Sequence, residues 1–270
     1  MGILQRKTPL EKEWDALLKR EKTFLAQQAE KQDSLLNQKL AEKIPPGLQN
    51  TLDTAFFKAF HLIFEKGTGV IEKTYRRDQL EQTCQVNQYA HHLRQDRKTL
   101  KTFSKGARSA GTKGVLLSGA FGVGMGLLGV GLPDIPLFTG MLLRTVYEIA
   151  LGYGYSYDTE EEQYFILLLI QGAVSHGSTL EEINAEVNRY IWSQALPEDY
   201  DRDAQIKKTA DALSKELLYM KFLQGIPLVG AVGGVCDMVS MRQITEYAKL
   251  KYQRRFLKDS GAHGQNPRHL

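Results

Sequence analysis

The chain has 270 residues and a mass of 30.5 kDa; 42% of its residues are hydrophobic and 24% are charged. This balance is typical of a soluble globular protein with a full core, and the mean hydropathy of −0.34 excludes a polytopic membrane protein. Two cysteines, Cys84 and Cys236, are too few for a disulfide scaffold or a four-cysteine zinc site. The first residues contain no apolar stretch typical of a secretory signal, so we expect a cytoplasmic protein.

Residues 9–43 have the pattern of one long polar helix, because apolar residues recur at helical spacing in a background rich in Glu, Lys and Gln. Pro45-Pro46-Gly47 ends this pattern, since proline cannot continue a helix. We therefore divide the chain into a polar helical extension over 1–46, a helical domain over 47–258 and a disordered tail over 259–270.

The domain shows helical periodicity along its length and no stretch with the period of two expected of a strand. Two helix starts carry capping-box pairs, Asp158 with Glu161 and Ser178 with Glu181. The sequence thus predicts an all-α fold, a single multi-helix domain with central glycine-rich apolar helices. The expected helices cover residues 48–65, 70–93, 97–112, 136–152, 158–176, 178–194, 204–222 and 227–258.

Charge is strongly segregated although the net charge is only +4. Residues 158–203 carry a balance of −9 and residues 205–258 a balance of +6. Residues 85–113 carry seven basic side chains against one acid, and these form the candidate anionic-lipid surface: Arg94, Arg97, Lys98, Lys101, Lys105, Arg108 and Lys113. Such a block is either a solvated helix face that pairs with other charges or a surface for anionic lipid. Nucleic acid is the weaker partner, because the basic stretch from Arg94 to Lys113 contains one aromatic residue, Phe103, and no nucleic-acid motif.

Residues 114–133 form an uncharged, glycine-rich run of twenty residues. Its length suits a membrane span, but each glycine in a helix costs about 1 kcal/mol relative to alanine, so another element must approach closely. Two interpretations stay open, a buried central helix and a membrane-inserting hairpin formed with 136–152. The dinucleotide motif Gly124-x-Gly126-x-x-Gly129 lacks the preceding strand that it requires. The candidate close-packing or insertion glycines are Gly122, Gly126, Gly129, Gly131, Gly230, Gly233 and Gly234.

Four ionisable residues in apolar surroundings form the candidate polar cluster: Asp134, Arg144, Glu148 and Asp237. Arg144 and Glu148 are four residues apart and can pair within one helix, while Asp134 can cap the helix that follows it. The alternative interpretation is a pocket with a buried acid–base group. His61 and Glu65 share a helix face, but no third ligand has a suitable spacing, so we expect no metal site. The sequence identifies no cofactor.

Two blocks of residues resemble the EcsC protein family over about residues 50–257. The first comprises Gly131-Leu132-Pro133-Asp134-Ile135-Pro136, Arg144, Glu148-Ile149-Ala150 and Tyr153-Gly154-Tyr155, and the second comprises Lys221, residues 227–234, Ala248 and Tyr252-x-x-Arg255-Phe256. The resemblance implies an intracellular bacterial helical protein of unassigned molecular activity, from a family named for a protein encoded beside an ABC transporter. The family pattern has Asn at the position of Asp237, so no role carries over to that residue.

These observations support two hypotheses on function. The first is a peripheral membrane protein, accessory to transport or secretion, whose basic block binds an anionic membrane surface or an ABC-transporter-linked complex. Each basic residue near such a surface contributes about 1 kcal/mol, so six or seven suffice for reversible binding. The alternative is a soluble, hydrolase-like enzyme with an acidic pocket at Asp134, Glu148 and Asp237.

Overall fold

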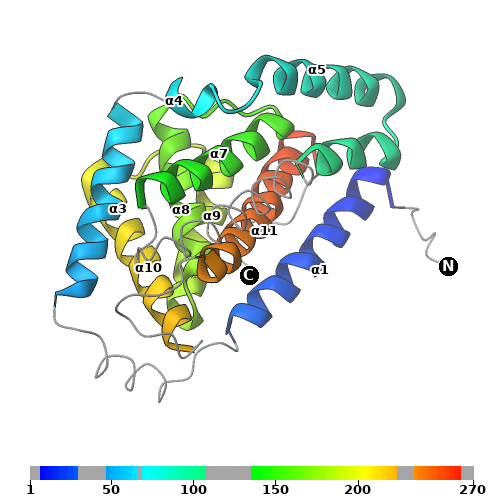
Figure 1. The fold of residues 1–270 in the computed structure, drawn as a ribbon. Helices are drawn as coiled ribbons and strands as arrows, with labels where there is room; N and C mark the ends of the chain where they lie inside the picture. The colour runs from blue at the N-terminus through cyan, green and yellow to red at the C-terminus, as the bar shows by residue number, and fades with distance from the viewer. Residues whose placement is uncertain (1–6, 30–46, 66–68, 108–134, 224–233, 263–270) are drawn as a thin grey trace.

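The computed structural model describes residues 7–29, 47–65, 69–107, 135–223 and 234–262. Within these ranges the chain forms helices and no strand, which confirms the all-α prediction (Figure 1). We call the helical segment 97–107 the basic helix. The other helices are α1 (Pro9–Ala29), α3 (Leu48–Glu65), α4 (Gly69–Glu72), α5 (Arg77–Arg94), α7 (Ile135–Tyr153), α8 (Glu160–Val174), α9 (Gly177–Ser193), α10 (Arg202–Leu223) and α11 (Gly234–Asp259).

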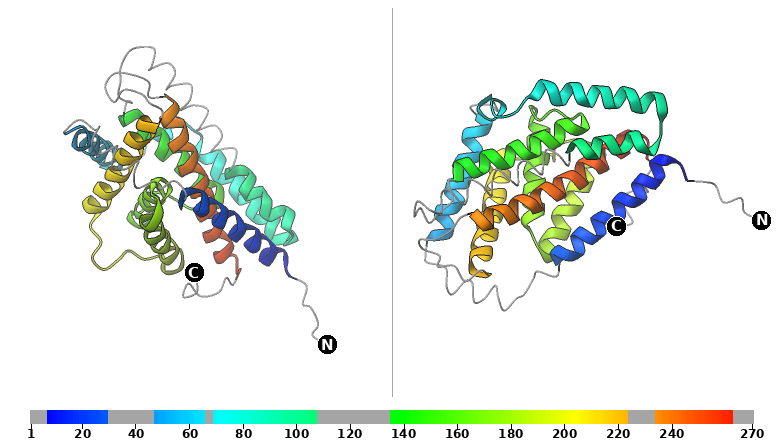
Figure 2. Two further views of the ribbon diagram at one scale, coloured as in Figure 1. Left: turned by 90° about the horizontal axis from the view of Figure 1, so that it is seen from below. Right: turned by 45° about the vertical axis from the view of Figure 1, so that its right-hand side comes forward.

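Helix α8 lies at the centre of the bundle. Its run Phe165–Ile170 is buried at every position, as expected of a helix that is apolar on all sides and surrounded by other helices. Helices α9, α10 and α11 pack against it, α3 covers α10 and α7, and α5 runs along α7 at the outer edge (Figures 1 and 2). At Gly172 an added Cβ would approach Tyr247 to 2.9 Å, so glycine lets α11 pack closely on α8.

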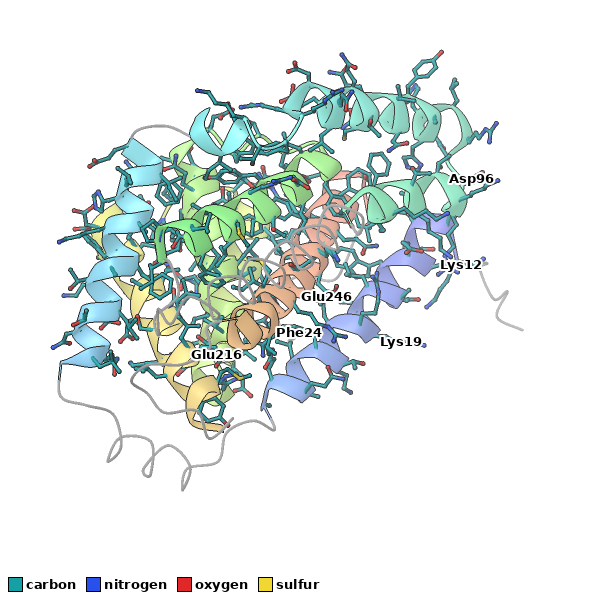
Figure 3. All side chains as sticks on the ribbon, in the orientation of Figure 1. Lys12, Lys19, Phe24, Asp96, Glu216 and Glu246 are labelled. Atoms are coloured by element: carbon teal, nitrogen blue, oxygen red, sulfur yellow. The ribbon has the colours of Figure 1, made fainter. Side chains whose placement is uncertain are left out.

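Helix α1 packs along α11 and α9. Its residues Trp14 and Leu17 are buried in the common core, and the ring of Phe24 stacks on Tyr247 of α11 at 5.3 Å (Figure 3). Lys19 points to solvent on the other side of the helix. The predicted continuation of this helix to residue 43 lies outside the described residues.

Three local predictions are wrong, and in two of them a tertiary contact decides the local structure. The helix expected over 70–93 is interrupted at residues 73–76, where the Tyr75 hydroxyl donates to the Tyr157 hydroxyl at 2.6 Å. Asp158 does not cap α8, because the Arg77 guanidinium binds its carboxylate at 2.6 Å; Thr159 is the cap instead. Helix α9 begins at Gly177 after His176, without the predicted serine cap.

The glycine-rich run of residues 114–133 lies outside the described residues, as do residues 224–233. Of the seven candidate glycines, Gly234 alone falls within a described helix, as the first residue of α11. Among the described helices, only α7 is long and apolar enough to cross a membrane, and 67% of its most apolar window is buried inside the protein. Helix α7 therefore has the burial of a core helix.

Candidate functional site

The predicted polar cluster is described in part. Arg144 Nε and Glu148 Oε1 lie 2.8 Å apart, which confirms the predicted pairing, and the Arg144 guanidinium lies 5.9 Å from the centre of the Tyr75 ring. Asp134 lies outside the described residues, and Asp237 lies in the first turn of α11, where its side chain is not described. Glu148 is therefore committed to an ion pair with its helix neighbour.

The predicted basic surface centres on the outer face of the basic helix. Lys98, Lys101 and Lys105 are exposed there and form no ion pair with any described residue, while Leu100 and Phe103 are buried on the opposite face. This periodicity makes the segment amphipathic.

The remaining residues of the predicted surface differ from these lysines. Arg94 is exposed at the end of α5, whereas Arg97 is paired with Glu13 of α1 at 2.8 Å. Arg108 and Lys113 lie outside the described residues. The described part of the basic surface therefore consists of three unpaired lysines and Arg94.

An exposed row of apolar side chains, which sequence reasoning missed, lies on α5, the helix that precedes the basic helix. Val86, Tyr89 and Leu93 are 67%, 68% and 65% exposed, and their spacing places them on one side of the helix. We call these three residues the apolar stripe. Cys84, on the opposite side of α5, is buried against the core. The spacing was visible in the sequence, but an apolar face of a helix ordinarily predicts burial.

A cavity of about 930 Å³ opens between the ends of several helices. The start of α1, the ends of α5, α7 and α11, and the basic helix all contribute to its wall. Three rings form an aromatic cluster in this wall: Phe103 and Phe256 have centroids 4.4 Å apart, and Tyr153 lies 5.8 Å from Phe256. The volume of the cavity is that of a small-molecule site.

Polar groups of this cavity are held by neighbouring helices. The Tyr155 hydroxyl donates to Asp259 Oδ2 at 2.7 Å, and Gln194 Nε2 donates to Asp259 Oδ1 at 3.1 Å. Burial and the Asp259 carboxylate raise the pKa of Tyr155 well above its usual range. Burial also lowers the pKa of His91, whose Nδ1 lies 2.9 Å from the Thr99 hydroxyl.

A buried layer supports the cavity wall from behind. The Arg255 guanidinium lies 4.1 Å from the centre of the Tyr155 ring, and its Nη1 donates to Glu162 Oε2 at 2.6 Å. Tyr252 donates to the other oxygen of the same carboxylate, also at 2.6 Å. The structure thus brings Tyr153-Gly154-Tyr155 and Tyr252-x-x-Arg255-Phe256 to one place, although about a hundred residues separate them in the chain.

Replacing Gly154 with alanine is expected to destabilise the cavity wall. Gly154 has a φ of +86°, and an added Cβ would lie 2.7 Å from Gln88 Nε2 and 3.2 Å from Cys84 Sγ. The left-handed backbone and this contact with α5 together cost about 2 kcal/mol or more of unfolding free energy. Denaturant unfolding measures this change.

The control for this substitution is Gly140→Ala within α7, where an added Cβ meets nothing within 4 Å. Alanine there is expected to stabilise the protein by about 0.5–1 kcal/mol. Equal effects of the two substitutions would contradict the special role of Gly154.

Comparisons with known proteins identify a family and two similar proteins. A family model described as "EcsC protein family" matches residues 11–257, so the match begins within α1, earlier than the resemblance alone placed it. Two Bacillus subtilis (strain 168) proteins are similar. "Protein EcsC" is 22% identical over 257 residues, covering 92% of this chain and 94% of that protein. "Uncharacterized protein YdbA" is 26% identical over 137 residues, or 45% of each chain. No solved structure matches.

Proposed function

The chain belongs to the EcsC protein family, and from this premise we propose that it is a peripheral membrane protein that binds anionic membrane surfaces through α5 and the basic helix. The observation that carries the proposal is the succession of two exposed faces on consecutive helices. The apolar stripe ends at Leu93, and the row of unpaired lysines begins at Lys98. An accessory role in transport or secretion would be exercised at this membrane surface.

Both faces have the chemistry that an interfacial membrane protein needs. Aliphatic and tyrosine side chains partition into the headgroup region, and lysines bind anionic lipid at about 1 kcal/mol each. Gln95, in the left-handed conformation, ends α5 and turns the chain directly into the basic helix. His91 contacts Thr99 and Phe103 and so joins the two helices, which means that one helical hairpin carries both rows.

Vesicle flotation tests this proposal with two triple variants. Replacing Lys98, Lys101 and Lys105 with glutamine removes about 3 kcal/mol of attraction, so binding to anionic vesicles at low salt is expected to fall roughly a hundredfold. Replacing Val86, Tyr89 and Leu93 with serine is expected to remove the part of binding that persists at high salt.

A matched control carries glutamine at Lys207, Lys208 and Lys215 of α10, a helix on the other side of the bundle (Figure 1). This control lowers the net charge equally and is expected to bind like the unmodified protein. If it loses binding as strongly as the basic-helix variant, the attraction is an effect of net charge and not of this surface. Failure of the unmodified protein to float with anionic vesicles would overturn the proposal.

A further inference from the structure

We propose that α1 lowers the affinity of the protein for anionic membranes, because Glu13 withholds Arg97 from the lipid. The inference rests on the membrane-binding surface proposed above and concerns the regulation of that surface. Arg97 is the first residue of the basic helix, and its separation of four residues from Lys101 places both side chains on one face of that helix. Arg97 nevertheless differs from the three unpaired lysines, because an acid of another helix binds it.

The contact between Glu13 and Arg97 joins the first turns of α1 to the start of the basic helix. Arg97 Nε donates to Glu13 Oε2 at 2.8 Å. Figure 3 shows the sequence neighbours Lys12 and Asp96 at the same corner of the molecule. The two partners are unequally buried, because the side chain of Glu13 is 7% exposed and that of Arg97 is 44% exposed. The guanidinium therefore has access to solvent, whereas the carboxylate has almost none.

This unequal burial decides which partner Arg97 keeps at a membrane. If Arg97 turned to a lipid phosphate, Glu13 would stay buried without a cation. Breaking an ion pair is strongly unfavourable when it leaves an uncompensated buried charge. One basic side chain at an anionic surface improves binding only about fivefold. The cost of leaving Glu13 unpaired exceeds this gain, so Arg97 stays with Glu13 when the protein binds the membrane.

The other acids of α1 have different partners. Glu11 accepts hydrogen bonds from the residue that precedes the helix, and Asp15 binds Lys7. Glu21 binds two buried cations of α11. Within the described part of the chain, Glu13 is therefore the one acid of α1 that binds a cation of the predicted basic surface.

Vesicle flotation of the Glu13→Gln variant tests the inference. The neutral side chain releases the guanidinium, so binding to anionic vesicles at low salt is expected to rise about fivefold. Asp211→Asn is the matched control, because it raises the net charge equally at an ion pair on α10. The control is expected to bind like the unmodified protein. An unchanged affinity of the Glu13→Gln variant, or an equal rise in the control, would overturn the inference.

A double variant identifies the cation that is released. Glu13→Gln combined with Arg97→Gln has the net charge of the unmodified protein and is expected to bind with the unmodified affinity. If the double variant keeps the fivefold gain, Arg97 is not its source and the inference is wrong. Thermal unfolding of each variant checks that its fold is intact.

The two proposals fail in different ways. Absence of flotation of the unmodified protein with anionic vesicles would overturn the membrane-binding surface and, with it, the role of α1. Flotation that depends on the three lysines but does not increase in the Glu13→Gln variant would overturn the role of α1 alone.

Discussion

Replacing Glu21 with glutamine is expected to lower the free energy of unfolding by about 3–5 kcal/mol, because it leaves two buried cations without their anion. Glu21 of α1 lies 3.1 Å from Lys251 Nζ and 2.6 Å from Arg254 Nη1, both on α11. The side chains of Glu21, Lys251 and Arg254 are 6%, 1% and 6% exposed, so water cannot replace the lost carboxylate. Asn188 accepts from Lys251 but carries no charge.

The pH dependence of this loss separates a charge effect from a packing effect. Burial lowers the pKa of Lys251 from 10.5 to about 8, and Glu21 opposes that shift. Between these values the unfolded chain binds more protons than the folded protein, so the free energy of unfolding rises with pH. Without Glu21 the folded lysine deprotonates at lower pH. The loss of unfolding free energy in the Glu21→Gln variant, relative to the unmodified protein, is therefore expected to be largest near neutral pH and to shrink as the pH rises.

Glu13→Gln is the matched control on the same helix. Its partner Arg97 is 44% exposed and can turn to solvent, so the expected cost is below about 1 kcal/mol. Adding Lys251→Met to Glu21→Gln removes one of the orphaned cations and is expected to restore part of the stability. If Glu21→Gln costs no more than Glu13→Gln at neutral pH, the buried cluster does not hold α1 to α11.

Much of the fold follows from local pattern. Helical spacing of apolar residues predicts both ends of α3 and places the ends of α7 to within one residue. A separation of four residues predicts the Arg144–Glu148 ion pair. Periodicity fails where a tertiary contact decides the local structure. The break before α5 depends on the hydrogen bond between Tyr75 and Tyr157, which are 82 residues apart in sequence.

The candidate site was less predictable than the fold. Its wall comes from five separate segments of the chain, and no local spacing shows that Phe103, Tyr155 and Phe256 meet. The burial of Lys251 also could not be predicted from local spacing, because a lysine in a charged helix is ordinarily exposed. Conversely, Val86 and Leu93 have the spacing of a buried face but are exposed. Periodicity identifies a face of a helix, and only the neighbouring helices determine whether that face is covered.

Glu162→Gln is expected to cost a similar amount, about 3–5 kcal/mol, and to act directly on the cavity wall. The carboxylate is the ionic partner of Arg255, and the two side chains are only 4% and 9% exposed. Glutamine can still accept from the Tyr252 hydroxyl, so the loss comes from the unpaired guanidinium. Because that guanidinium stacks on the Tyr155 ring at 4.1 Å, amide hydrogen exchange at residues 153–155 is expected to accelerate as well.

A double variant shows whether charge is the cause. Glu162→Gln combined with Arg255→Met leaves a neutral pair of similar volume, and stability is expected to recover by more than half, as it does when buried ion pairs are replaced by apolar groups. Glu186→Gln serves as the control, because Glu186 also accepts from a tyrosine, Tyr164, but is only partly buried; its expected cost is below about 1 kcal/mol. If the double variant is as unstable as Glu162→Gln alone, the lost stability comes from packing. Arg255 then does not support the cavity wall through its charge.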